Sequence, residues 1–364
     1  MADINVADIR QEIGGVMDPD IGLRLEDLDA VKDIRVSGNL IEIDLELVQP
    51  IHWVAERINT MCVKVMEQVA PEHETEINFM EKPAPNAERD ILKGVKNIIA
   101  VSSGKGGVGK SAIAANLAAA LSLSGANVGI LDGDVYGPSQ PTMFGLEGQQ
   151  FEAEEGPNGQ PLAVPLEKYG IKVASMGFIM QKEEAAIVRG PMLAGYFSLL
   201  FEQIKWGPLD FLIFDLPPGT GDIQLTLTQR VPLTGAVVVT TPQEISVADV
   251  RRSVKMFEKV KVDLLGIIEN MSYFVPDDMP DKKYYIFGEG GGKKVAQECN
   301  VDLLGEVPLS IKMREKSDGG KPMVLDDDSG EQGNVIRGLA GEIVAKVRKL
   351  NYEKMSDPGL EISI

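Results

Sequence analysis

The sequence predicts an α/β fold: a mostly parallel sheet covered by helices on both faces, preceded by a small α+β domain. The first reason is that short apolar runs alternate with amphipathic segments after about residue 95. The second is that a glycine-rich loop directly follows the first of these runs. The third is that the residues before about 80 carry hairpin and helix patterns of their own.

The small domain is predicted from a turn, a hairpin and a helix. Prolines and glycines supply the backbone angles of tight turns, which indicates a turn at Asp18-Pro19-Asp20-Ile21-Gly22. Two segments then alternate apolar and polar residues around Ser37-Gly38-Asn39, as in a β-hairpin. The predicted elements are strands at 31–36 and 40–47, a helix at 53–69 and a last short strand at 76–80.

The large domain is predicted from five apolar runs with helical patterns between them. Such alternation implies right-handed crossovers, so that all the strands point the same way. Ligands of these sheets bind at the carboxyl ends of the strands. The predicted strands span residues 98–101, 128–131, 211–214, 236–239 and 264–268.

The loop after the first of these strands fits the G-x-x-x-x-G-K-[ST] pattern and predicts a P-loop NTPase. Its glycines let backbone N–H groups approach phosphate oxygens, above the positive end of a helix expected at 111–123. Lys110 is expected to reach the β and γ phosphates of ATP, and Ser111 to place its hydroxyl on Mg²⁺. The predicted nucleotide-binding residues of the loop are Gly104, Lys105, Gly106, Gly107, Val108, Gly109, Lys110 and Ser111.

Acidic residues follow two other predicted strands. Asp132 and Asp134 come after 128–131, and Asp134 is expected to order the attacking water with Asp132 in support. Asp215 ends the strand 211–214 in the Walker B arrangement, so it is expected to bind Mg²⁺ through water. The predicted catalytic residues are Lys105, Lys110, Asp134 and Asp215, and the predicted metal-binding residues are Ser111, Asp134 and Asp215.

A second lysine, Lys105, distinguishes this loop, which reads K-G-G-V-G-K-S. This form resembles the MinD/ParA/Mrp class of P-loop ATPases, and essentially the whole chain resembles the Mrp/ApbC type. In that class the first lysine reaches the partner's nucleotide, so the resemblance implies a homodimer with ATP at its interface and a slow, dimerisation-dependent ATPase. It also implies that Asn270 bonds the adenine edge and that Pro308 lies in a second base-lining segment.

The small domain resembles the one fused to Mrp-type ATPases and found alone in iron-sulfur maturation. The resemblance implies a carrier that transfers iron-sulfur clusters to apoproteins, with the small domain binding clients or maturation factors. Cluster-carrying Mrp proteins have a Cys-x-x-Cys after Asn-Met-Ser-Tyr-Phe, but here that loop holds Asp277, Asp278 and Asp281, and is expected to be solvated. The chain's cysteines are Cys62 and Cys299, so the family's ligand cysteines are missing.

Composition limits the partners and the compartment. The chain has 364 residues and a net charge of −19, which disfavours nucleic acid and anionic membranes as partners. With two cysteines, no basic and apolar leader and no run long enough to span a bilayer, the protein is expected to be cytoplasmic. The predicted domains are 1–80, a linker at 81–94, the ATPase domain at 95–355 and a tail at 356–364.

Two other functions remain open on the sequence alone. One is a MinD/ParA-like switch that dimerises with ATP and positions a partner without carrying a cluster. The other is a nucleotide-gated scaffold with negligible turnover. A basic membrane helix is not expected, because the apolar face of the last helix should pack on the sheet; it comprises Val335, Leu339, Ile343, Val347 and Leu350. Arg189 lies in a further family motif, and the residues suggest no role for it.

Overall fold

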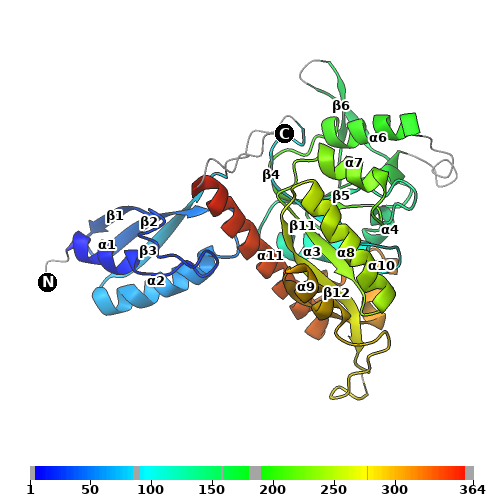
Figure 1. Ribbon diagram of the computed structural model, residues 1–364. Helices are drawn as coiled ribbons and strands as arrows, with labels where there is room; N and C mark the ends of the chain where they lie inside the picture. Colours follow the sequence, from blue (N-terminus) through cyan, green and yellow to red (C-terminus); the bar gives the residue numbers. More distant parts are fainter. Residues whose placement is uncertain (1–4, 85–90, 157–158, 180–189, 277, 357–364) are drawn as a thin grey trace. The chain divides into compact units, whose positions relative to one another are not determined.

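The computed structural model describes residues 5–84, 91–156, 159–179, 190–276 and 278–356 (Figure 1). Two compact units result, Met1–Ala87 with Val344–Ile364, and Glu88–Ile343. The predicted domain limits remain a prediction. Those limits assigned residues up to 355 to the ATPase domain, whereas the residues from Val344 onward group with the first unit. None of the described helices combines the length and apolar character that a membrane crossing requires.

The first unit contains a three-stranded sheet in the order β1-β2-β3, together with α1, α2 and the end of the last helix. β1 and β2 form the predicted hairpin, and β3 pairs parallel to β2. Alternate residues of β2, including Ile41, Ile43 and Leu45, are fully buried with Cys62 of α2. The elements are α1 (Val6–Gly14), β1 (Val31–Ser37), β2 (Leu40–Val48), α2 (Ala55–Val69) and β3 (Glu74–Lys82).

The end of the last helix completes this unit with polar contacts. Arg348 is fully buried and donates two hydrogen bonds to the carboxylate of Asp18, at 3.0 and 2.7 Å. It also donates to Asp20 and to the backbone oxygen of Val48. The predicted packing of the whole helix on the large sheet was therefore wrong for its last residues, where a buried charge follows the apolar positions.

The second unit contains an eight-stranded sheet in the order β13-β12-β11-β4-β10-β5-β9-β8. All neighbours pair in parallel except β8 with β9, so the predicted fold class is confirmed. The described residues also form a separate β6-β7 ribbon. The strands are β4 (Val95–Ser102), β5 (Val128–Asp132), β6 (Glu152–Glu155), β7 (Pro161–Val164), β8 (Leu166–Lys168), β9 (Ile171–Ser175), β10 (Leu209–Asp215), β11 (Gly235–Thr240), β12 (Leu264–Phe274) and β13 (Leu303–Leu309).

Helices cover both faces of this sheet, as two neighbouring residues of β12 illustrate (Figure 1). The amide of Asn270 bonds Val108, just before α3, whereas the carboxylate of Glu269 accepts from the N–H of Gly292 at the start of α9. Successive side chains of a strand point to opposite faces, so α3 and α9 lie on opposite sides. The helices are α3 (Lys110–Leu123), α4 (Gln140–Met143), η1 (Met176–Phe178), α6 (Gly190–Glu202), α7 (Asp222–Arg230), α8 (Glu244–Lys259), α9 (Gly291–Cys299), α10 (Ile311–Asp318), η2 (Met323–Leu325) and α11 (Gly330–Ser356).

Candidate nucleotide and metal site

The phosphate loop connects β4 to α3 at the carboxyl edge of the sheet. Two positions of the loop have room only for glycine, because other residues lie too close for a side chain. A Cβ on Gly104 would lie 2.4 Å from the Cβ of Asp249, and one on Gly109 would lie 2.3 Å from the amide nitrogen of Asn270. Gly109 also has a φ of +78°, which side chains disfavour. The backbone can therefore keep this tight course only with glycine at these positions.

Lys110 and Asp215 meet as a buried ion pair below the loop. The ammonium of Lys110 donates to Oδ1 of Asp215 and lies 3.3 Å from the hydroxyl of Ser111. Lys110 is 6% exposed and Asp215 is fully buried. The structure thus brings together three residues that the sequence predicted for phosphate and metal binding.

Asp132 organises the loop that carries Asp134. One carboxylate oxygen of Asp132 accepts from the backbone N–H groups of Ser139 and Gln140 and from the hydroxyl of Ser175, at 3.0 to 3.1 Å. The other accepts from the N–H of Asp134 at 3.1 Å. Burial and the neighbouring charge of Asp215 raise the pKa of Asp132 to about 7. The carboxylate of Asp132 therefore holds the backbone of the loop from Asp134 to Gln140 in place.

Asp134 is half-buried at the edge of this cluster. Its carboxylate accepts from the N–H of Gly137 at 3.2 Å. Burial raises its pKa, and the positive charge of Lys110 opposes that rise. Asp134 thus lies close enough to Lys110 and Asp215 to feel both charges, and it is a candidate for ordering water.

Two glutamines that sequence reasoning did not assign to the site lie beside it. The amide of Gln140 donates to Asp215 at 2.8 Å, and that of Gln224 donates to the hydroxyl of Ser102 at the end of β4. Both side chains are buried, and both amide oxygens lack a hydrogen-bond partner in the described part of the chain. Gln224 was predicted only to cap or begin α7; Gly221 is the N-cap residue.

The two predicted base-binding residues lie on the neighbouring strands β12 and β13. The amide of Asn270 donates to the backbone oxygen of Val108 at 2.8 Å, so it contacts the phosphate loop itself. Pro308 follows Val307, the register partner of Asn270, and its backbone oxygen accepts from Gln332. Their contacts with adenine remain predictions.

Lys105 differs from Lys110 in its surroundings. It is half-buried, and among the described residues its ammonium has no hydrogen bond or ion pair. Its backbone oxygen accepts from the hydroxyl of Ser103 at 2.9 Å, which fixes the loop but not the side chain. Of the other residues singled out in the sequence, Asp278 and Asp281 are exposed, and Arg189 and Asp277 lie outside the described residues.

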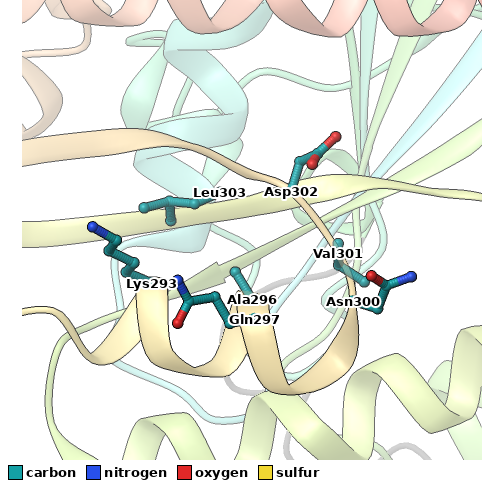
Figure 2. Close-up of a pocket in the computed structure, with 7 residues that line it drawn as sticks. All are labelled: Lys293, Ala296, Gln297, Asn300, Val301, Asp302 and Leu303. Carbon is teal, nitrogen blue, oxygen red and sulfur yellow. The ribbon is translucent and has the colours of Figure 1, made fainter.

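A pocket of about 430 Å³ lies between α9 and the start of β13 (Figure 2). It holds none of the residues predicted to bind the nucleotide. Because the site defined by Lys110 and Asp215 has a connected set of charged groups, we place the chemistry there and not in this pocket. The pocket is lined by Lys293, Ala296, Gln297, Asn300, Val301, Asp302 and Leu303.

The surroundings of Cys62 and Cys299 do not favour either thiol as a cluster ligand. Cys62 is fully buried in the first unit, where burial raises the pKa of its thiol to about 12. Cys299 ends α9 in the second unit, is half-buried, and also has a thiol pKa raised by burial. Metal-binding cysteines need the thiolate form, so these surroundings disfavour ligation.

Comparison with known proteins assigns both units to families. Residues 94–344 match the family described as NUBPL iron-transfer P-loop NTPase. Residues 6–79 match the family described as iron-sulfur cluster assembly protein. Both matches agree with the resemblance seen in the sequence.

Curated relatives align over most of the chain. A protein of Synechocystis sp. is 45% identical over 91% of this chain and 95% of its own length. One of Aquifex aeolicus is 41% identical over 88% and 92%. Both are named iron-sulfur cluster carrier protein.

Solved structures show the same fold. A nucleotide-binding protein from Archaeoglobus fulgidus, solved in complex with ADP, is 37% identical and covers 65% of this chain and 92% of its own, with a TM-score of 0.56. The cell division ATPase MinD of Pyrococcus furiosus is 20% identical and covers 68% and 98%, with a TM-score of 0.50, so it supports the fold alone. From the phosphate loop, the family matches and these relatives together, the chain belongs to the NUBPL-type family of iron-transfer P-loop NTPases.

Proposed function

We propose that this protein binds and hydrolyses Mg²⁺-ATP and uses that cycle to carry iron-sulfur clusters to apoproteins. The observation that carries the ATPase part is the buried contact between Lys110 of the phosphate loop and Asp215 at the end of the neighbouring strand β10. The cluster part is supported by the family and by relatives named as cluster carriers. ATP would give ADP and phosphate after attack by water.

The oxygen donors of the site fit magnesium. Mg²⁺ prefers carboxylates, hydroxyls, phosphates and retained waters, and Ser111, Asp134 and Asp215 supply the first two kinds of group. When bound, the ion would neutralise charge that develops on the phosphate oxygens. Lys110 donates to Oδ1 of Asp215. A bound phosphate would compete for that lysine and leave Oδ1 available to a metal-bound water.

Lys105 is proposed to act on the nucleotide of a second copy across a homodimer interface. We expect Lys105→Ala to lower hydrolysis about 10-fold or more, because one charged contact to a transferring phosphoryl group is lost. ATP binding to the single chain should change little, because Lys110 and the loop backbone remain. The measurement is steady-state hydrolysis against protein concentration. A variant that keeps the wild-type rate and the wild-type concentration dependence would rule out action across the interface.

The proposed cargo is an iron-sulfur cluster, which the family and the named relatives support. The described thiols, Cys62 and Cys299, lie in different units and have raised pKa values, so we derive no ligand set for a cluster from them. Anaerobic reconstitution with iron and sulfide, followed by iron counting and visible absorption, tests the role directly. A bound cluster that moves to an apoprotein supports it. A colourless protein that still hydrolyses ATP would overturn the carrier role and leave the ATPase proposal standing.

We propose apoprotein clients as partners and the cytoplasm as the compartment. Both cysteines are free thiols, as in proteins of reducing compartments. The MinD/ParA-like organiser is not favoured, because the likeness to MinD supports the fold alone whereas the relatives at 41% to 45% identity are named cluster carriers.

A further inference from the structure

Gln140 lies among the proposed magnesium ligands, although no sequence motif marks it. It begins the short helix α4, immediately after the loop that carries Asp134, and its side chain is fully buried. Its backbone N–H donates to Asp132 at 3.1 Å, and Asp132 is itself the last residue of β5. The position of Gln140 is therefore fixed by the end of a central strand.

Two hydrogen bonds fix the orientation of its amide. Nε2 donates to Oδ2 of Asp215 at 2.8 Å and to the backbone oxygen of Ser111 at 3.2 Å. Both partners are acceptors, so only the NH₂ end of the amide can face them, and both of its hydrogens are used. Oε1 must then point elsewhere.

That oxygen is buried and has no hydrogen-bond partner among the described residues. The hydroxyl of the preceding residue, Ser139, is in the same condition. A buried acceptor without a partner costs about 1–3 kcal/mol. Two such groups lie on successive residues, and one of these residues is bonded to Asp215. They indicate a place that another polar molecule, such as water, completes.

We infer that Gln140 is a positioning residue for magnesium: its amide holds Asp215, and its Oε1 accepts a hydrogen bond from a water bound to the ion. This inference rests on the proposed Mg²⁺-ATP function. The carboxylate of Asp215 is shared between Lys110 on Oδ1 and Gln140 on Oδ2. When phosphate takes Lys110, Gln140 still fixes the carboxylate. Magnesium keeps several of its waters in proteins, and one of them would be the donor to Oε1.

The test compares Gln140→Met with the wild type. Methionine has a similar length but no donor or acceptor amide. Groups that orient metal ligands change metal affinity about 10-fold to 100-fold, so we expect Mn²⁺ to bind the nucleotide complex at least about 10-fold more weakly, as measured by electron paramagnetic resonance. Binding of a fluorescent ATP analogue in EDTA should be unchanged. Thr142→Val on the same helix, whose hydroxyl bonds Glu147, is the matched control and should retain wild-type Mn²⁺ affinity.

Failure of the role of Gln140 and failure of the proposed Mg²⁺-ATP function give different results. If Gln140→Met binds Mn²⁺ as tightly as the wild type, the glutamine only packs the core and the inference is overturned, whatever happens to the unfolding temperature. If Gln140→Met does not fold, Gln140→Asn takes its place, since its shorter amide cannot reach both partners and should weaken Mn²⁺ in the same way. A wild-type protein that binds no ATP in the presence of Mg²⁺ would instead overturn the proposed function.

Discussion

Lys110→Ala is expected to lower ATP hydrolysis about 100-fold to 1,000-fold, the loss typical when a charge-stabilising donor is removed from a transition state. The lysine lies at the first residue of α3, where the loop backbone and the helix end already favour phosphate. Its ammonium forms a buried ion pair with Asp215. Hydrolysis at saturating Mg²⁺-ATP and binding of a fluorescent ATP analogue are the measurements.

The same substitution should also destabilise the free protein. Removing one partner of a buried ion pair costs about 3–5 kcal/mol, because the other charge stays buried. Here the hydrogen bond from Gln140 to Asp215 remains, so the loss should fall toward the lower end. Lys110→Ala with Asp215→Asn removes both charges and should recover stability without recovering hydrolysis. Substantial hydrolysis by Lys110→Ala under conditions where it is folded would contradict the role of this lysine.

The parts of the site that the sequence predicted are local in the chain. The loop from Gly104 to Ser111 is a continuous pattern between a strand and a helix, and Asp215 directly ends an apolar strand. Parallel pairing of β10 with β4 then brings these ends together, since Asp215 is in register with Val101. The loop motif, the periodicity of the strands and one topological rule were sufficient to predict that these residues lie together.

The parts that could not be predicted depend on contacts between residues far apart in sequence. Gln140 and Asp215 are separated by 75 positions, and an amide at the start of a four-residue helix has no pattern to mark it. Helix α1, before the turn at 18–22, was also not predicted from the sequence. Its N-cap residue is Asn5, whose side chain accepts a hydrogen bond from the N–H of Ala7.

The turn at Asp18 also makes a contact with a residue far away in the sequence, and the sequence did not predict it. Its residues predicted a local turn, and Asp18 does accept from the N–H groups of Asp20 and Ile21, at 3.0 and 3.1 Å. Its carboxylate also binds Arg348, which is 330 positions away. A charged residue on the last helix would ordinarily be assigned to the solvent, so sequence periodicity alone could not reveal this partner.

Arg348→Ala is therefore expected to destabilise the first unit by about 3–5 kcal/mol, because it leaves the carboxylate of Asp18 buried without its cation. Four hydrogen bonds from the guanidinium would be lost, to Asp18, Asp20 and the backbone of Val48. Arg348→Lys should be nearly as harmful, since an ammonium cannot make the paired contact to one carboxylate. The measurements are chemical denaturation followed by fluorescence, and limited proteolysis of residues 1–87.

Two controls test whether the buried pair of Arg348 and Asp18 is the cause of the expected destabilisation: the variant Arg57→Ala, and ATP binding by Arg348→Ala. Arg57 pairs with the same acidic turn through Asp20 but is 51% exposed, so Arg57→Ala should cost no more than about 1 kcal/mol. ATP binding by Arg348→Ala should be unchanged, because the residues that form the nucleotide site all belong to the second unit. If Arg348→Ala instead unfolds no more easily than Arg57→Ala, the buried pair does not hold the small unit together. If it also loses ATP binding, the two units depend on each other for folding, and the last helix stabilises both.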